Sequence, residues 1–292
     1  MNTLINLSLE SKDIDIERDY KEIKVYGFGS DGMVGASKNF MKVLGSLKEN
    51  YVQGYFEYDS KKSGGVTISH LRAGPTRINA PYFLTNPDFI VVSKDIYLNR
   101  YYCLKDIKEN GILLISSNKT DSELNALMND ENKREILSKN IKVYIANLDE
   151  LNEKYKLKGK INNIICMYML KISGYGRYEI DNFKTLVEKT YISKGKNVVD
   201  NNIGAIEEGL KYLEEIDNSI FTINNNSNTE TNFTNEILKL RGNDLKVSDF
   251  LEYKDGTFEG GTASSDKRKI SAFVPKWCGG NCIECNQCAF VC

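Results

Sequence analysis

The last eleven residues, CIECNQCAFVC, hold the densest group of potential metal ligands in the chain. Cys282, Cys285, Cys288 and Cys292 are spaced C-x2-C-x2-C-x3-C. Thiolates at this spacing can bind a 4Fe-4S cluster from one loop, and the spacing is that of the bacterial iron–sulfur motif without its final proline. Zinc is the alternative, although zinc sites usually use two separated ligand pairs. We therefore expect an iron–sulfur ligand set here.

This ligand set is expected to be incomplete. In two-cluster ferredoxins the fourth cysteine of one run binds the other cluster. The sequence has no second cysteine run for Cys292 to serve, although Cys278 lies four residues upstream of Cys282. We therefore expect a labile cluster, and the alternative is a non-catalytic remnant with a zinc-binding tail.

A second stretch, YGFGSDGMVGASK (26–38), has the chemistry of phosphate binding. Gly27, Gly29 and Gly32 form G-x-G-x-x-G after a predicted strand and before a predicted helix. Such glycines let the backbone approach a ligand, and the free N–H groups of the helix start favour a phosphate. A tight strand–helix turn without a ligand is the alternative. Asp31 either caps the helix, which is the commoner role, or repels a phosphate.

The turn DSKKSGG (59–65) follows the next strand-like run. In an NAD-binding unit an acidic residue in this region holds the ribose hydroxyls, and Asp59 could take that role. Lys61 and Lys62 would instead suit an additional phosphate, as in NADP or coenzyme A. The alternative without a ligand is a solvated, charged turn.

Three further side chains with reactive groups are interpreted as structural. His70 is the only histidine and lies on an apparent strand, where a hydrogen-bonded structural role is more common than catalysis. Cys103 and Cys166 lie in apolar, helical surroundings and are expected to be buried.

The elements that would position these residues alternate between strands and helices. Helical spacing of apolar residues follows the first strand, separates the last three strands, and continues from about 160 to 216. This alternation predicts an α/β domain with a mostly parallel sheet and flanking helices, followed by a small irregular C-terminal segment. The strand-like runs are 22–28, 51–58, 65–72, 88–93, 111–116 and 141–146.

The chain divides into four parts on these patterns. The stretch 217–236 is rich in Asn, Ser and Thr and almost lacks large apolar residues, which is typical of a linker. The predicted parts are an N-terminal lead (1–20), a main domain (21–220), an Asn-rich linker and connector (221–250), and a connector with the truncated ferredoxin-like segment (251–292).

Composition limits the partners and the compartment. The 292 residues include 39 Lys+Arg and 40 Asp+Glu, so a net charge of -1 gives no global attraction for nucleic acid or an anionic membrane. The N-terminus lacks the features of a signal peptide, and the apolar runs are too short to cross a bilayer. Seven cysteines, five of them among the last fifteen residues, fit a reducing compartment. We expect a cytoplasmic protein without nucleic-acid or membrane partners.

Four stretches, in this order, resemble the pyruvate:ferredoxin (flavodoxin) oxidoreductase family: YGFGSDGMVGASKNFMKVLG, YVQGYFEYDSKKSGGVTISHLRAGP, DGTFEGGTASSDKRKISAFVPKW and CIECNQCAFVC. The resemblance runs from about residue 20 to the end, with a divergent stretch near 217–236. The main domain resembles the gamma-type domain, which in the family is associated with coenzyme A. Residues 266–268 resemble the connector before the ferredoxin-like domain, and the cysteine run resembles the first cluster motif of that domain.

The resemblance implies a part of an oxidoreductase that converts pyruvate or another 2-oxo acid to its coenzyme A thioester and passes electrons to ferredoxin or flavodoxin. This chain would contribute coenzyme A binding and part of the iron–sulfur path. In the family other domains hold thiamine diphosphate and the 2-oxo acid, and no stretch here resembles them. We therefore expect an inactive component, either a subunit or a truncated product, that needs chains or domains with the thiamine diphosphate and pyruvate sites. No catalytic residue is assigned.

The family motif also assigns the coenzyme A site to individual residues. The family turn DGTVGANK differs here at Met33 and Ser37, which replace a threonine and an asparagine that could each reach a phosphate, so the affinity is expected to be reduced. Asp266 stands where the family more often has glutamate. The alternative function is an NAD(P)- or nucleotide-binding Rossmann-like module. The matching residues are Gly27, Gly29, Asp31, Gly32, Gly35, Lys38, Lys61, Lys62 and Ser63.

Overall fold

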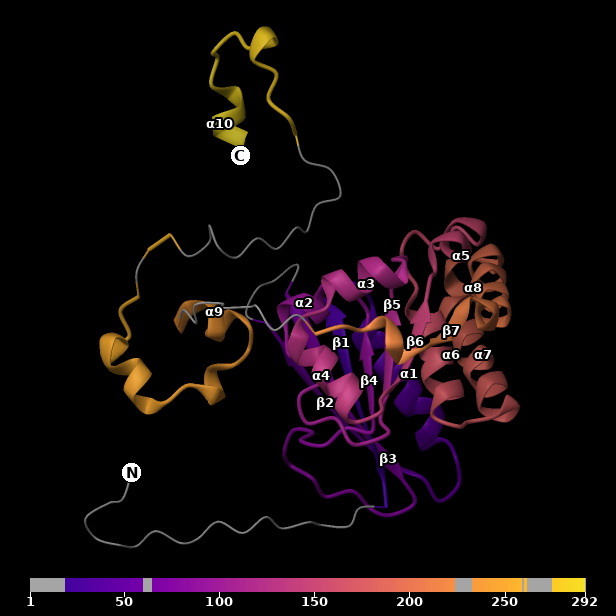
Figure 1. The fold of residues 1–292 in the computed structure, drawn as a ribbon. Helices are drawn as coiled ribbons and strands as arrows, with labels where there is room; N and C mark the ends of the chain where they lie inside the picture. Colours follow the sequence, from indigo (N-terminus) through magenta and orange to yellow (C-terminus); the bar gives the residue numbers. More distant parts are fainter. Residues whose placement is uncertain (1–18, 60–64, 224–232, 259, 262–274, 292) are drawn as a thin grey trace, which may run out of the picture.

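The computed structural model describes residues 19–59, 65–223, 233–258, 260–261 and 275–291. Its centre is a seven-stranded sheet in the order β2-β3-β1-β4-β5-β6-β7 (Figure 1). β1, β4, β5 and β6 pair in parallel, whereas β2, β3 and β7 pair antiparallel with their neighbours. The predicted α/β fold with a mostly parallel sheet is confirmed. The strands are β1 (Lys21–Phe28), β2 (Tyr51–Tyr58), β3 (Val66–Gly74), β4 (Phe89–Val92), β5 (Ile112–Ser116), β6 (Lys142–Ala146) and β7 (Leu213–Ile216).

The six predicted strands all form, and the apolar runs of those at the centre of the sheet are buried from both sides. β4 shows this most clearly, since all four of its residues are buried. Val91 packs in the core on one face of the sheet, and Ile90 and Val92 pack in the core on the other. A strand covered on both faces needs continuous apolar residues rather than alternation.

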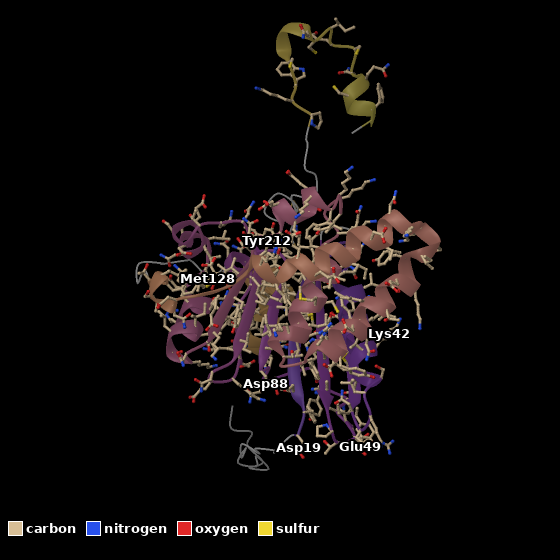
Figure 2. All side chains as sticks on the ribbon, turned by 90° about the vertical axis from the view of Figure 1, so that its right-hand side faces the viewer. Asp19, Lys42, Glu49, Asp88, Met128 and Tyr212 are labelled. Atoms are coloured by element: carbon tan, nitrogen blue, oxygen red, sulfur yellow. The ribbon has the colours of Figure 1, made fainter. Side chains whose placement is uncertain are left out.

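Two layers of helices cover the sheet, and side chains fill the space between them and the strands (Figure 2). On the first face α6 is buried from Asn163 to Leu170, as expected of a helix that is apolar all round. The helices of this face are α1 (Met33–Gly45), α5 (Asp149–Lys154), α6 (Asn162–Ile172), α7 (Arg177–Tyr191) and α8 (Lys196–Gly209). Those of the second face are α2 (Tyr97–Arg100), α3 (Asp121–Leu127) and α4 (Asp130–Ser138).

The prediction of helix as far as residue 216 is wrong at its end. Helix α8 stops at Gly209, a 3-10 turn follows at Leu210–Tyr212, and β7 then pairs antiparallel with β6. Leu213 packs against the core of the first face and Ile216 against that of the second. The backbone groups at the edge of β6 and the two apolar contacts outweigh the local helical pattern.

The segment predicted as linker and connector, 221–250, contains structured residues. A 3-10 turn at Asn218–Ile220 leads into Phe221, which is 3% exposed and packs in the core of the second face. The backbone N–H of Thr222 then donates to Asn125 Oδ1 (3.0 Å). Phe221 is the large apolar residue that the Asn-rich composition obscures, and the stretch 224–232 lies outside the described residues.

A short helix, α9 (Phe233–Leu238), continues the structured part of this segment. The Phe233 ring stacks on Tyr253 with 4.4 Å between ring centres, so residues from both ends of 233–258 meet. Lys105 pairs with Asp244 (2.6 Å) and joins the segment to the main domain. The remaining elements are the 3-10 helices Ile192–Lys194, Gly242–Asp244, Val247–Tyr253 and Gly279–Asn281, and helix α10 (Gln287–Val291). Within the described parts of the chain, no helix is long and apolar enough to cross a membrane.

A buried ion pair fastens β3 to β1. Arg72 and Glu22 are opposite each other in the strand register, and Arg72 Nε lies 3.0 Å from Glu22 Oε1. Their side chains are 2% and 1% exposed. Arg72 also donates to the carbonyl oxygens of Ala80 (3.4 Å) and Phe83 (3.3 Å), which holds the loop after β3 against the sheet.

Replacing Arg72 should therefore destabilise the fold strongly. We expect Arg72→Met to lower the free energy of unfolding by about 3–5 kcal/mol, because Glu22 stays buried without its guanidinium partner. Urea denaturation followed by circular dichroism measures this. The control is Lys105→Met, which removes an ion pair whose side chains are 44% and 46% exposed and should cost about 0–1 kcal/mol. Equal losses in the two variants would contradict the assigned role of the buried pair.

Candidate ligand-binding site at the carboxyl edge of the sheet

The glycine-rich turn (29–32) joins β1 to α1 and has an unusual backbone. Ser30 and Gly32 have φ angles of 79° and 87°, in the left-handed region that favours glycine. Gly27 is required for packing, because a Cβ there would lie 2.6 Å from Met33 Cβ and 2.6 Å from Thr67 Oγ1. Two of the three motif glycines are thus required by the structure, Gly27 by packing at the end of β1 and Gly32 by its φ angle in the turn.

Asp31 is the hydrogen-bonding centre of this turn. Its Oδ1 accepts from the N–H of Met33 (2.9 Å), the first N–H group of α1. Its Oδ2 accepts from the N–H of Phe28 (2.7 Å) and from Ser93 Oγ (2.7 Å), which follows β4. The carboxylate therefore caps the helix and also ties the turn to the neighbouring strand.

A pocket of about 270 Å³ opens beside the turn. Residues 28–34 form one side, and Tyr58, Asp59 and residues 65–67 from the ends of β2 and β3 form the other. The N–H of Gly29 donates to the carbonyl oxygen of Gly65 (2.8 Å), which joins the two sides. Lys61, Lys62 and Ser63 lie outside the described residues, and the residues that flank their segment, Asp59 and Gly65, line the pocket.

Three of the predicted residues that the structure describes lie outside the pocket lining. Gly35 lies in the first turn of α1, and a Cβ there would meet no atom within 4 Å. Lys38 lies farther along α1, with Nζ 5.3 Å from the centre of the Phe56 ring. Of the predicted residues that the structure describes, Gly29, Asp31 and Gly32 line the pocket, whereas Gly27, Gly35 and Lys38 do not.

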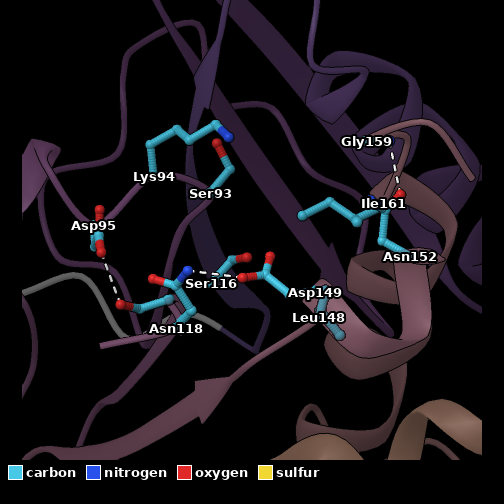
Figure 3. Close-up of a pocket in the computed structure, with 11 residues that line it drawn as sticks. Ser93, Lys94, Asp95, Ser116, Asn118, Leu148, Asp149, Asn152, Gly159 and Ile161 are labelled. Carbon is cyan, nitrogen blue, oxygen red and sulfur yellow. Dashed lines mark hydrogen bonds between the residues drawn. The ribbon is translucent and has the colours of Figure 1, made fainter. Parts of the chain in front are cut away.

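A second pocket, of about 200 Å³, lies at the carboxyl ends of β4, β5 and β6 (Figure 3). Three hydrogen bonds connect its lining residues: Ser117 Oγ donates to Asp95 Oδ2, Asn118 Nδ2 to Asp149 Oδ2, and Gly159 N to Asn152 Oδ1, each at 2.7 Å. The lining residues are Ser93, Lys94, Asp95, Ser116, Ser117, Asn118, Leu148, Asp149, Asn152, Gly159 and Ile161.

Sequence analysis missed the second pocket because its residues form no motif. They come from loops that are far apart along the chain and meet only in the folded sheet. The signal that could have revealed them is positional, since a Ser, Asn or Asp follows each of three predicted parallel strands closely. The carboxyl ends of parallel strands share one edge, where α/β proteins bind ligands.

His70 has structural contacts on both ring nitrogens. Nδ1 accepts from the N–H of Leu84 (3.1 Å), and Nε2 is hydrogen-bonded to Glu57. The ring stacks on Phe83, and these contacts agree with the predicted structural role. Cys103 and Cys166 are buried, as predicted, and burial raises the pKa of both thiols.

The cysteine run has exposed thiols. Cys282, Cys285 and Cys288 are free and exposed, and so is Cys278, whereas Cys292 lies outside the described residues. The N–H of Glu284 donates to Cys282 Sγ (3.4 Å) and lowers the pKa of that thiol. The donor chemistry suits an iron–sulfur cluster. No three potential ligands are gathered among the residues that the structure describes, so the cluster stays a prediction.

Comparison with known proteins identifies the class. Residues 22–212 match the family described as pyruvate ferredoxin/flavodoxin oxidoreductase. Residues 226–271 match a second family, described as a domain of unknown function. The chain therefore belongs to the pyruvate ferredoxin/flavodoxin oxidoreductase family, as its sequence motifs indicated.

Curated relatives are much longer than this chain. It is 37% identical over 285 residues to the pyruvate:ferredoxin oxidoreductase of Moorella thermoacetica, covering 92% of this chain and 24% of the relative. It is also 37% identical over 281 residues to the pyruvate-flavodoxin oxidoreductase of Klebsiella pneumoniae, with the same two coverages. The chain thus spans about a quarter of the length of these relatives, which are oxidoreductases of the 2-oxo acid:ferredoxin type.

Solved structures share the fold. Pyruvate oxidoreductase subunit PORC of Thermotoga maritima superposes with a TM-score of 0.55 at 20% identity, over 68% of this chain and 100% of that subunit. A 2-oxoglutarate:ferredoxin oxidoreductase of Magnetococcus marinus superposes with a TM-score of 0.51 at 13% identity, over 71% of this chain and 33% of that one.

Two glycine substitutions should differ in their effect on stability, because one glycine has a positive φ angle and the other lies in a helix with free space beside it. We expect Gly32→Ala to lower the free energy of unfolding by about 1 kcal/mol or more, because an L-residue at positive φ is strained. Gly35→Ala, in helix α1 with free space around the new Cβ, should be neutral or stabilising by up to about 1 kcal/mol. Urea denaturation of both variants checks this. A greater loss in Gly35→Ala would contradict the described turn.

Proposed function

We propose that this chain is the coenzyme A-binding, gamma-type component of a pyruvate or 2-oxo acid:ferredoxin (flavodoxin) oxidoreductase. The observation that carries the proposal is the pocket between the β1–α1 turn and the ends of β2 and β3, whose rim holds both ends of the lysine-containing turn. The main domain, 21–220, would bind the ligand. Residues 221–250 would connect it to the ferredoxin-like segment at 251–292.

The free N–H groups of α1 support phosphate binding at this pocket. In the first turn, Asp31 accepts from Met33 N, and Ala36 N donates to the carbonyl oxygen of Gly32 (2.9 Å). The N–H group of Val34, which lines the pocket, remains for a phosphate oxygen.

Lys61 and Lys62 would bind the additional phosphate of coenzyme A. They belong to the segment between Asp59 and Gly65, and both of these residues line the pocket. An NAD(P)-binding module is the competing function, in which Asp59 would hold a ribose. Asp31 already places one negative charge at the turn. A ligand with several phosphates would therefore need the positive charges of Lys61 and Lys62 to offset the repulsion.

Oxidative decarboxylation would require further polypeptide. The relatives carry about three quarters of their length outside the part that this chain matches. We assign thiamine diphosphate, the pyruvate site and the ferredoxin or flavodoxin contact of the full enzyme to other domains or chains, and we place the assembly in the cytoplasm. This chain alone would then be inactive.

The cysteine run would supply part of the electron path. Its thiols are exposed, and the N–H of Glu284 stabilises a thiolate at Cys282. N–H donation to sulfur also tunes iron–sulfur clusters. Cys282, Cys285, Cys288 and Cys292 would be ligands of a 4Fe-4S cluster.

Calorimetry with the full chain tests coenzyme A binding. We expect binding of coenzyme A to be stronger than binding of dephospho-coenzyme A or NADP, because in the proposal Lys61 and Lys62 bind the terminal phosphate of coenzyme A. Lys61→Ala/Lys62→Ala should lower the coenzyme A affinity by about ten-fold and remove the preference over dephospho-coenzyme A.

The control is Lys171→Ala/Lys189→Ala, which removes two charges from the ends of α6 and α7, outside the pocket lining. This variant should bind coenzyme A as the unchanged chain does. Tighter binding of NADP than of coenzyme A by the unchanged chain would favour the nucleotide-binding alternative.

Anaerobic reconstitution tests the iron–sulfur proposal. We expect fewer than one cluster per chain, rapid loss of the cluster in air, and an EPR signal in the reduced state. Exposed thiolates that do not hold a complete cluster can be oxidised or can bind zinc instead. Cys282→Ser should abolish the signal, whereas Cys166→Ser, at a buried thiol, should leave it unchanged. A full complement of stable four-iron clusters after gel filtration would contradict the incomplete ligand set, and zinc alone would favour the remnant.

A further inference from the structure

The second pocket is adjacent to the first. Ser93 lines the second pocket and Asp31 lines the first, and Ser93 Oγ lies 2.7 Å from Asp31 Oδ2. On the opposite side, a Cβ on Gly32 would lie 3.1 Å from Cγ of Asn162, the neighbour of the lining residue Ile161. The Ser93–Asp31 hydrogen bond therefore lies between the two pockets.

The separating hydrogen bond lies where the strand order reverses. From β1 the chain passes through α1 to β2 and β3, which lie on one side of β1 within the sheet. The next strand, β4, lies on the other side of β1. Asp31 follows β1, and Ser93 follows β4. In open α/β sheets ligands bind in the crevice at this reversal, outside the carboxyl ends of the strands. An extended ligand there would contact both pockets.

The charges of the second pocket disfavour a phosphate. Among the described residues, the lining holds the two carboxylates Asp95 and Asp149 and one cation, Lys94, and Lys119 outside the lining pairs with Asp95 (3.9 Å). Each carboxylate also accepts a hydrogen bond from a lining side chain, Ser117 or Asn118. An uncharged ligand group avoids the repulsion that a phosphate would meet from the two carboxylates.

The walls of the second pocket suit a chain that is polar on one side and apolar on the other. Ser116 and Asn118, at the end of β5, offer a hydroxyl and an amide (Figure 3). Leu148, which is 4% exposed, and Ile161 supply an apolar wall opposite. Hydrogen-bonding groups beside apolar side chains are typical of small-ligand pockets.

We infer that the second pocket binds the pantetheine arm of coenzyme A while its phosphates stay at the β1–α1 turn. This arm is uncharged and carries amides, a hydroxyl and geminal methyl groups, which match the two walls. The inference rests on the proposed coenzyme A binding. It adds Ser116 and Asn118 as binding residues for the arm and places the reactive thiol end toward β5 and β6.

Comparing coenzyme A with adenosine 3′,5′-bisphosphate isolates the contribution of the arm. Calorimetry with the full chain should give an affinity for coenzyme A about ten-fold above that for the bisphosphate, as expected from a few added hydrogen bonds. Ser116→Met, which fills the second pocket, should remove this advantage and leave the bisphosphate affinity unchanged. The control is Ser138→Met, the same substitution at an exposed residue that ends α4 near the start of β6, at the opposite edge of the sheet.

Asn118→Leu provides a second variant at an exposed position, where folding is least affected, and it should also reduce only the coenzyme A affinity. Thermal melting confirms that each variant is folded. If both variants kept the full advantage of coenzyme A, or if the unchanged chain bound the two ligands equally, the inference would be overturned while the proposed function stood. If neither ligand bound the unchanged chain, the proposed function and the inference would both fail.

Discussion

The carboxylate of Asp31 is the interaction on which the candidate site depends. It accepts three hydrogen bonds, from the end of β1, from the start of α1 and from the residue after β4. These contacts fix the turn relative to two parallel strands. The positions of both pockets therefore depend on the hydrogen bonds of this one carboxylate. A charged acceptor makes each of these bonds stronger than a neutral one would be. The positive φ angles at Ser30 and Gly32 are maintained by the same contacts.

This arrangement changes what the helix start can offer a ligand. The N-terminal charge of α1 is partly compensated by Asp31, so the proposed phosphate binding would depend on the N–H group of Val34 in the pocket lining rather than on the helix dipole alone. Basic side chains would then have to supply the charge. Lys38 is positioned over Phe56 and lies outside the pocket lining. In the proposal this role falls to Lys61 and Lys62, because the described residues that flank their segment, Asp59 and Gly65, line the pocket.

The elements of the fold that depend on neighbouring residues in the sequence were predictable. Those that depend on pairing with distant strands were less so. Continuous apolar runs predicted β4, β5 and β6, because strands buried on both faces need such runs. β7 was missed, because Leu213–Ile216 continues a helical pattern and becomes a strand only by pairing with β6. The turn of the first pocket was predictable from its glycines. The second pocket was not, since Ser93, Ser116 and Leu148 become neighbours only through the strand order.

The same contrast distinguishes the two candidate functional regions. The linings of the two pockets at the sheet edge come from several loops whose spacing depends on strand register. They therefore need the whole domain, including the Arg72–Glu22 pair that joins β3 to β1. The cysteine run is a local motif, and its described residues from 275 to 290 are all exposed. The Cys282 thiol accepts a hydrogen bond from the adjacent backbone N–H of Glu284. The candidate ligand site is therefore a property of the folded main domain, whereas the cysteine run is a property of its local sequence.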